Sequence, residues 1–314
     1  MIQMINYYKT INGVVTPVDA IEKDCWINMV DPQEDEINYI SSELDIELDF
    51  LRAALDDEES SHIDVEDDQI LTIVDIPLAE EHDGAIIYST MPLGIIYSKD
   101  NIITVCLKEN SILAEFAQGR MKGVYTNMKA RFIFQILYRV SVRYLQYLKQ
   151  IDKISKDMEK QLHKSMKNQK LFQLLDLEKS LVYFSTSLKA NEATIKKISR
   201  GKIIKLYEED EDLLEDVLVE VSQAIEMCNI YSTILSSTMD AFASIISNNL
   251  NIVMKYLASF TIILSVPTMI ASFYGMNVGG IPLASGPYGF WIALGISGVA
   301  TLIATIALIK NKLL

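Results

Sequence analysis

The chain has 314 residues, of which 42 are acidic and 28 are basic, so its formal net charge is −14 at pH 7. This balance argues against a nucleic-acid-binding protein, because such proteins neutralise phosphates with lysine and arginine. It argues equally against docking on anionic lipid. It is compatible with divalent cations as partners, and also with an acidic surface that only keeps a domain soluble. The three cysteines are far apart, which fits reduced cytosolic thiols rather than a zinc cluster.

Residues 1–110 are predicted to form a cytoplasmic α/β domain. Short apolar or β-branched runs predict strands at residues 14–16, 25–29, 69–76, 86–88, 93–97 and 102–107. We expect Pro17 and Pro77 to end the strands that precede them. Asp31 and Pro32 predict the N-cap and first residue of a helix. Strands with helices between them favour a layered α/β fold.

The rest of the cytoplasmic part is predicted to be helical. Apolar residues follow helical spacing through a helical region at 111–207. From residue 208 the pattern meets no glycine or proline until Pro267. It predicts one helix over 208–273, roughly 100 Å long at 1.5 Å per residue. A helix of that length is expected to be a stalk that enters a membrane, supported by other helices or by other copies of itself.

Residues 256–309 contain no Asp, Glu, Lys or Arg. A hydrocarbon core of about 30 Å needs about 20 apolar residues per helix. The run therefore predicts two transmembrane helices, the end of 208–273 and a second helix at 289–309, joined by an outer loop at 274–288. The fold class expected is an α+β cytoplasmic domain joined by a very long stalk helix to a two-helix transmembrane segment.

Positive residues indicate the orientation in the membrane. Lys255 lies at the start of the first span, and a basic tail at 310–314 follows the second. Because such residues mark the cytoplasmic side, we expect a multi-pass protein of the cell membrane with both termini in the cytoplasm. Residues 1–10 have no apolar core of the kind that a signal peptide needs.

A polar stripe runs along the first span. Its hydroxyl residues are four, three and four positions apart, which places them on one helix face: Thr261, Ser265, Thr268 and Ser272. The same alternation continues downward through Ala258, Met254, Asn251, Ser247, Ser244 and Asp240. Ser259 is the polar exception on the other faces. Two interpretations stay open, a tight contact between helices or the lining of a polar pore. Two helices cannot enclose a pore, so the second interpretation requires several copies of the chain.

The first span ends in Tyr274-Gly275-Met276-Asn277. The Gly-Met-Asn triplet, placed between a long helix and a second span with a basic tail, resembles the signature of the CorA family of divalent-cation channels. The architecture of the whole chain is similar to that family, and the motif-level similarity covers residues 240–277. The resemblance implies a funnel-shaped homopentamer in the lipid bilayer that carries Mg²⁺, and often Co²⁺ or Ni²⁺, passively down its gradient.

The resemblance also implies roles for individual residues. Neutral amide oxygens of Asn277 are expected to form an outer selectivity ring that accepts hydrogen bonds from the ion's hydration shell. Thr268 is expected to form a hydroxyl ring, Met254 and Leu257 a hydrophobic constriction, and Asn251 and Asp240 a polar and an acidic ring below it. The remaining expected pore residues are Gly275, Met276, Ser272, Ser265 and Thr261. The outer loop lacks the acidic residues that family members commonly carry there, which leaves the preferred metal open.

Channels of that family close when intracellular Mg²⁺ bridges carboxylates of neighbouring subunits. The candidates here are Asp216 on the long helix, and Asp56 or Asp57 in the acidic run 56–59. Bridging would neutralise like-charge repulsion and hold the stalks together. The alternative is that these carboxylates are ordinary solvated surface.

No enzyme motif is present in the sequence: it contains no P-loop, no Gly-x-Ser-x-Gly and no metal-binding histidine pair. The resemblance implies Mg²⁺, both transported and regulatory, and no organic cofactor is expected. Two alternatives stay open: a zinc transporter of the same fold, and a membrane-anchored sensor or scaffold. The sensor explains the two spans but not the polar stripe or Asn277.

Overall fold

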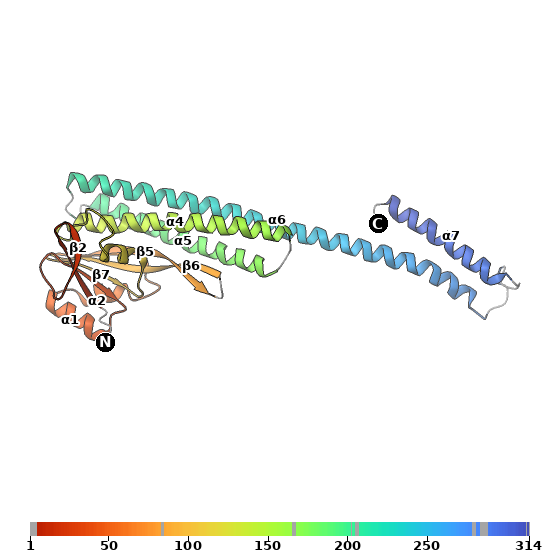
Figure 1. Cartoon of the computed structure of the whole chain (residues 1–314), viewed down its shortest axis with the longest axis horizontal. Helices are drawn as coiled ribbons and strands as arrows, with labels where there is room; N and C mark the ends of the chain where they lie inside the picture. The colour runs from red at the N-terminus through yellow and green to blue at the C-terminus, as the bar shows by residue number, and fades with distance from the viewer. Residues whose placement is uncertain are drawn as a thin grey trace. The chain divides into compact units, whose positions relative to one another are not determined.

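The computed structural model describes residues 5–82, 85–164, 168–201, 203–204, 207–277, 281–282, 288–311 and 313 (Figure 1). The chain divides into two compact units, Met1–Thr238 and Met239–Leu314. One helix, α6 (Glu208–Tyr274), contributes residues to both. The predicted subdivision of residues 1–207 stays a prediction.

A seven-stranded mixed sheet forms the centre of the first unit, with the order β2-β1-β3-β7-β6-β5-β4. The strands are β1 (Ile5–Ile11), β2 (Val14–Val18), β3 (Trp26–Val30), β4 (His62–Glu66), β5 (Gln69–His82), β6 (Ala85–Tyr97) and β7 (Ile102–Cys106). β3 and β7 pair in parallel, and the other neighbouring strands pair antiparallel.

Helices cover both faces of this sheet (Figure 1). On one face lie α1 (Glu34–Leu44) and α2 (Leu48–Ala53), whose residues Ile40 and Leu51 share a core with Ile27 of β3. The other side carries α3 (Ser111–Ala117), α4 (Lys129–Lys164) and α5 (Asn168–Gly201). There the buried Trp26 ring lies 4.8 Å from Tyr8 and 5.3 Å from Phe132. The predicted α+β class is confirmed.

Two prolines do not end strands as the sequence predicted. Pro17 lies inside β2, and Pro77 lies inside β5. β2 is an edge strand, and β4 pairs with β5 only as far as Ile73, so Pro77 lies on a stretch of β5 with no outer neighbour among the described strands. Edge positions tolerate proline because no ladder hydrogen bond is lost there. The sequence also failed to predict β1 and β4.

The start of α1 differs from the prediction as well. Its N-cap is Gln33 rather than Asp31, and the Glu36 carboxylate accepts a hydrogen bond of 3.0 Å from the Gln33 backbone N–H. Asp31 instead adopts the left-handed conformation, with φ +48°. An aspartate tolerates this conformation better than most residues, so here it turns the chain between β3 and the helix.

The side chain of Asn191 covers the free edge of β5. Asn191 lies on α5 and is 3% exposed. Its Oδ1 accepts from the Asp75 N–H at 2.8 Å, and its Nδ2 donates to the Asp75 carbonyl at 2.8 Å. One amide thus supplies both backbone bonds that a neighbouring strand would supply, at a point where β4 has ended.

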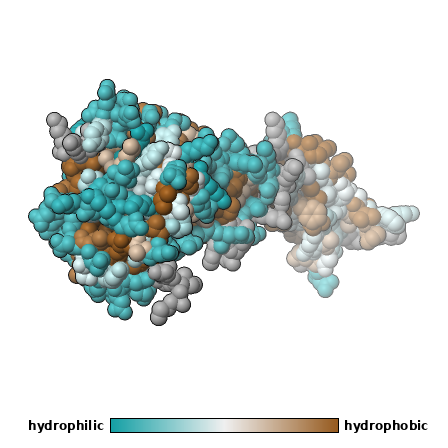
Figure 2. Space-filling model, turned by 60° about the vertical axis from the view of Figure 1, so that its left-hand side comes forward, coloured by the Kyte–Doolittle hydropathy of each residue, from teal (hydrophilic) through white to brown (hydrophobic). Residues whose placement is uncertain are grey.

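The membrane unit contains the C-terminal part of α6 and α7 (Gly289–Lys310), which run side by side (Figure 1). Both helices are long and apolar enough to cross a membrane. Figure 2 shows hydrophobic surface gathered on this unit, whereas the visible face of the first unit is largely hydrophilic. The predicted very long helix and the predicted C-terminal apolar helix are confirmed. Parts of the predicted outer loop (278–280 and 283–287) and Lys312 of the predicted basic tail lie outside the described residues.

We predict that Asn191→Leu lowers the free energy of unfolding by about 1–3 kcal/mol, because it removes two hydrogen bonds of roughly 0.5–1.5 kcal/mol each. The Asp75 N–H then keeps only its 3.2 Å bond to Ser61, and the Asp75 carbonyl only the Tyr144 hydroxyl at 3.1 Å. Thermal unfolding of the full-length protein in detergent measures the change as a lower Tm. Lys189→Ala, an exposed site on the same helix, is the matched control and should leave Tm nearly unchanged. An equal Tm for the Asn191 variant and the wild type would contradict the role of this amide.

Candidate functional site

The hydroxyl stripe lies on an exposed face of α6 within the membrane unit. Thr261 donates to the Leu257 carbonyl at 2.8 Å, Ser265 to the Thr261 carbonyl at 2.7 Å and Thr268 to the Leu264 carbonyl at 2.8 Å. Each bond links a hydroxyl to the carbonyl four residues earlier in its own helix. Ser272 shares the exposed face.

These bonds leave the stripe hydroxyls able to accept hydrogen bonds from a neighbouring group or from water. A carbonyl oxygen only accepts, so each hydroxyl uses its single hydrogen within the helix, and its oxygen lone pairs remain to accept. The exposed face of α6 is therefore lined with acceptors and carries no formal charge between residues 256 and 274. Such a face suits a cation or the water molecules around it, and it does not suit an anion.

The face of α6 opposite the hydroxyl stripe lies toward α7 and the residues that follow it. Ser259 is 1% exposed, and its hydroxyl donates to the Leu313 carbonyl beyond α7 at 2.7 Å. Ile263, Val266 and Ile270 are half-buried on the same face. At about 100° per residue, this face lies on the far side of the helix from the hydroxyl stripe. The second span therefore covers one side of α6 and leaves the stripe uncovered.

The Gly-Met-Asn triplet lies where α6 ends. Gly275 donates its N–H to the Ala271 carbonyl at 2.9 Å, and a Cβ added at this glycine would approach that oxygen to 3.3 Å. The tight turn therefore favours a residue without a side chain. Asn277 follows and is exposed. The Tyr274 hydroxyl donates to the Pro282 carbonyl at 3.3 Å, which ties the helix end to the outer loop. This contact could not be predicted from the sequence.

The lower part of the predicted pore is exposed on every side in a single chain. All residues from 243 to 258 are exposed, including Asn251. Met254 and Leu257 are 54% and 58% exposed. Asp240 is also exposed, and its carbonyl accepts a 3.0 Å hydrogen bond from Ser244. The exposed stretch is about 24 Å long at 1.5 Å per residue.

The predicted regulatory carboxylates are exposed on the first unit. Asp56 lies in the turn after α2, where its Oδ1 accepts from the Glu58 N–H at 3.0 Å. Asp57 follows it, and Asp216 lies on α6. Within the described part of one chain, no three metal-ligating side chains come together. A site shared between subunits stays a prediction.

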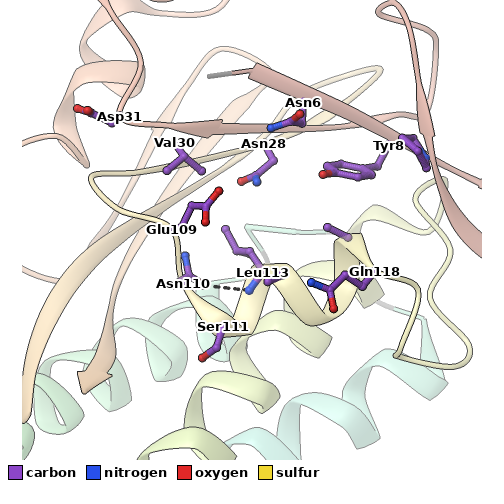
Figure 3. Close-up of a pocket in the computed structure, with 13 residues that line it drawn as sticks. Asn6, Tyr8, Asn28, Val30, Asp31, Glu109, Asn110, Ser111, Leu113 and Gln118 are labelled. Atoms are coloured by element: carbon purple, nitrogen blue, oxygen red, sulfur yellow. Dashed lines mark hydrogen bonds between the residues drawn. The ribbon is translucent and has the colours of Figure 1, made fainter. Parts of the chain in front are cut away.

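A pocket that the sequence did not predict lies between β1, β3 and α3 in the first unit (Figure 3). Its volume is about 740 Å³, and Asn28, which is 8% exposed, points into it. Asn28 Oδ1 accepts from Thr104 at 2.9 Å, and Thr104 in turn accepts from Trp26 Nε1 at 2.8 Å. Because tryptophan can only donate, this chain of bonds leaves the amide nitrogen of Asn28 facing the pocket.

The charged residues that line the pocket are acidic, and the others are neutral. Asp31 and Glu109 contribute carboxylates, and the lining residues include no Lys or Arg in the described part of the chain. Burial raises the pKa of Tyr8, and the nearby Glu109 carboxylate adds to the effect. The pocket therefore does not suit phosphate or another anion. The pattern in the sequence that could have indicated this pocket is the alternation of Asn6 and Tyr8 in β1, a strand that was not predicted.

The sequence matches the CorA-like Mg²⁺ transporter protein family over residues 22–310. The chain belongs to the CorA family. It is 30% identical over 287 residues to the cobalt/magnesium transport protein CorA of Methanocaldococcus jannaschii, covering 88% of this chain and 87% of that protein. The complete structure of the CorA magnesium transporter from the same organism matches with a TM-score of 0.84 at 25% identity, over 98% of both chains.

A more distant likeness concerns the first unit of this CorA-family chain. The cytoplasmic domain of ZntB from Vibrio parahaemolyticus matches with a TM-score of 0.62 at 13% identity, over 77% of this chain and 98% of that domain. At this identity the likeness shows the fold alone. The expected resemblance to the CorA family is confirmed, and the chain is a membrane transporter of that family.

We predict that single cysteines on the stripe of this CorA-family helix react with a water-soluble, membrane-impermeant thiol reagent, whereas cysteines on the face toward α7 do not. Ser265→Cys and Val266→Cys are the matched pair, because they are neighbours on different faces. The native cysteines are buried, so the background is low. Labelling is measured in proteoliposomes by a mass shift. Equal labelling at both positions would contradict a water-facing stripe.

Proposed function

We propose that the protein is a homopentameric channel that carries Mg²⁺, and also Co²⁺, passively across the cell membrane. The observation that carries this proposal is the position of the hydroxyl stripe, on the side of α6 away from α7. Copies arranged with α6 inside and α7 outside would bring their stripes to a common axis. The similarity to the cobalt/magnesium transport protein CorA of M. jannaschii supports these ions as the cargo.

Selection of the ion is proposed to occur at a ring of Asn277 side chains. Mg²⁺ gives up its waters reluctantly and prefers oxygen ligands. Neutral amide oxygens accept hydrogen bonds from the hydration shell without stripping it, and they bind weakly enough for the ion to leave. Below the ring, the acceptor oxygens of Thr268, Ser265 and Thr261 are proposed to guide the hydrated ion down the axis, together with Ser272 at the outer end.

The lower pore is proposed to contain the gate. Met254 and Leu257 form a hydrophobic constriction that closes by excluding water. Asn251 and Asp240 provide a polar and an acidic ring at the cytoplasmic end, where a carboxylate raises the local concentration of cations. Lys255 and Lys310 flank the two spans on the side proposed to be cytoplasmic. Intracellular Mg²⁺ bound between subunits by Asp216 and by Asp56 or Asp57 is proposed to hold the closed state.

Two alternatives predict different results in the same experiment. A zinc transporter of the same fold would carry Zn²⁺ in preference to Mg²⁺. The likeness to ZntB supports the shared fold but does not indicate which ion this chain transports. A membrane-anchored sensor or scaffold would carry no metal at all. Uptake of Mg²⁺, Co²⁺, Ni²⁺ and Zn²⁺ into liposomes that contain the purified protein, measured in parallel, distinguishes the three functions.

We predict that Asn277→Ala lowers the initial rate of Mg²⁺ uptake at least about tenfold, because a ring of several amides loses its hydrogen bonds to the hydration waters, each contributing roughly 0.5–1.5 kcal/mol. Asn248→Ala is the matched control, since it removes an exposed amide from the face of α6 away from the stripe. Its uptake should match that of the wild type. Equal rates for the Asn277 variant and the wild type would reject the selectivity ring.

We predict that neutralising Asp56, Asp57 and Asp216 together, each to Asn, weakens the inhibition of uptake by Mg²⁺ on the cytoplasmic side. The physical reason is that the bridging cation loses its ligands. Flux is measured against cytoplasmic Mg²⁺ concentration, and the half-inhibiting concentration should rise several-fold. A triple neutralisation of other exposed acids, Asp35, Glu43 and Asp49, controls for the change in net charge. Unchanged inhibition in the first variant would reject these carboxylates as the regulatory site.

A further inference from the structure

Ser259 is a polar residue of the first span that lies off the stripe and makes a contact of a different kind. The stripe hydroxyls Thr261, Ser265 and Thr268 bond within their own helix. Ser259 instead donates across to Leu313, 54 residues later, at 2.7 Å. Its side chain is 1% exposed, in a stretch of α6 where every residue from 243 to 258 is exposed. The cross-link therefore connects α6 to the segment that follows α7.

The backbone N–H of Leu313 is hydrogen-bonded as well as its carbonyl. Its N–H donates to the Leu308 carbonyl at 3.0 Å, and the Asn311 N–H donates to the Ala307 carbonyl at 3.1 Å. The chain after α7 thus folds back on the helix end, with Leu308 buried. The last carbonyls of a helix have no partner within the helix. The Ser259 hydroxyl supplies one for a carbonyl just beyond this end.

The position of Ser259 relates this cross-link to the proposed gate. Leu257 and Met254 precede it by two and five residues, which corresponds to roughly 3 and 8 Å along the helix axis. At about 100° per residue, both lie on the side of α6 opposite Ser259. The bond to Leu313 therefore lies at about the level of the proposed constriction, on the opposite side of α6.

We propose that the Ser259–Leu313 hydrogen bond is a clasp that fixes the lateral and rotational position of α6 at the constriction. Ser259 is then a positioning residue for transport, and this inference rests on the proposed function. Moving or rotating α6 at this level breaks the bond and leaves the Ser259 hydroxyl, which is 1% exposed, without its partner. Leaving a buried donor unsatisfied costs free energy. The clasp thus favours one position of the Met254 and Leu257 side chains.

Flux measurements test the functional part of the proposal. In Ser259→Ala, the residual Mg²⁺ flux at inhibiting cytoplasmic Mg²⁺ should rise about two- to tenfold, the equivalent of one hydrogen bond. The Mg²⁺/Co²⁺ flux ratio should stay unchanged, since Asn277 is intact. Ser259→Thr keeps a donor and should restore the wild-type residual flux. Thr301→Val removes a hydroxyl that donates to the Ser297 carbonyl of its own helix, so it serves as the matched control.

Two flux results would overturn the clasp: a residual flux in Ser259→Ala equal to that of the wild type, or a Ser259→Thr variant that behaves like Ser259→Ala. A second measurement does not depend on transport. A nitroxide on Leu313→Cys should become more mobile when Ser259→Ala is added, and equal mobility overturns the clasp even if flux changes. Absence of metal uptake by the wild type, with the change in mobility present, would reject the proposed function and retain the contact.

Discussion

The absence of water inside a bilayer is the constraint on which the membrane unit depends. A polar group there needs either a partner within the protein or a position that faces water. Thr261 and Ser265 give their hydrogen to their own helix and keep an acceptor oxygen on the exposed face, whereas Ser259 gives its hydrogen to Leu313 and is buried. The same kind of side chain thus serves two purposes, and the face of the helix decides which one.

The sequence predicted the membrane unit well because its signals are local. The predicted long helix at 208–273 differs from α6 by one residue at its end, and the predicted span at 289–309 differs from α7 by one residue. Helical spacing, a run without charge and a cluster of helix breakers each occur within a short window. The stripe could be recognised for the same reason, since it depends only on the period of one helix.

Features that depend on distant parts of the chain could not be predicted in this way. Pro17 and Pro77 are accommodated in strands because no described strand pairs with those edges, and that depends on the order of the whole sheet. Asn191 was not recognisable as a partner of Asp75, from which it is separated by 116 positions. Ser259 was visible as an exception to the stripe, but its partner was not. The carboxylates at Asp56, Asp57 and Asp216 present the same difficulty, since their proposed ligand lies between chains.

In a single copy of the chain, much of the surface of α6 is left uncovered. Residues 243–258 are exposed on every side, and α7 covers one face of the span above them. Asn251 and Ser247 precede the first span, where water can hydrate the amide and the hydroxyl, but apolar residues of the same stretch such as Val253 are exposed as well. In the proposed assembly, the polar face of each copy meets water along a shared axis, while the apolar faces meet other helices or lipid. Each face of α6 then has a suitable environment, water for the polar face and helices or lipid for the apolar faces. The same arrangement creates the proposed pathway for the ion.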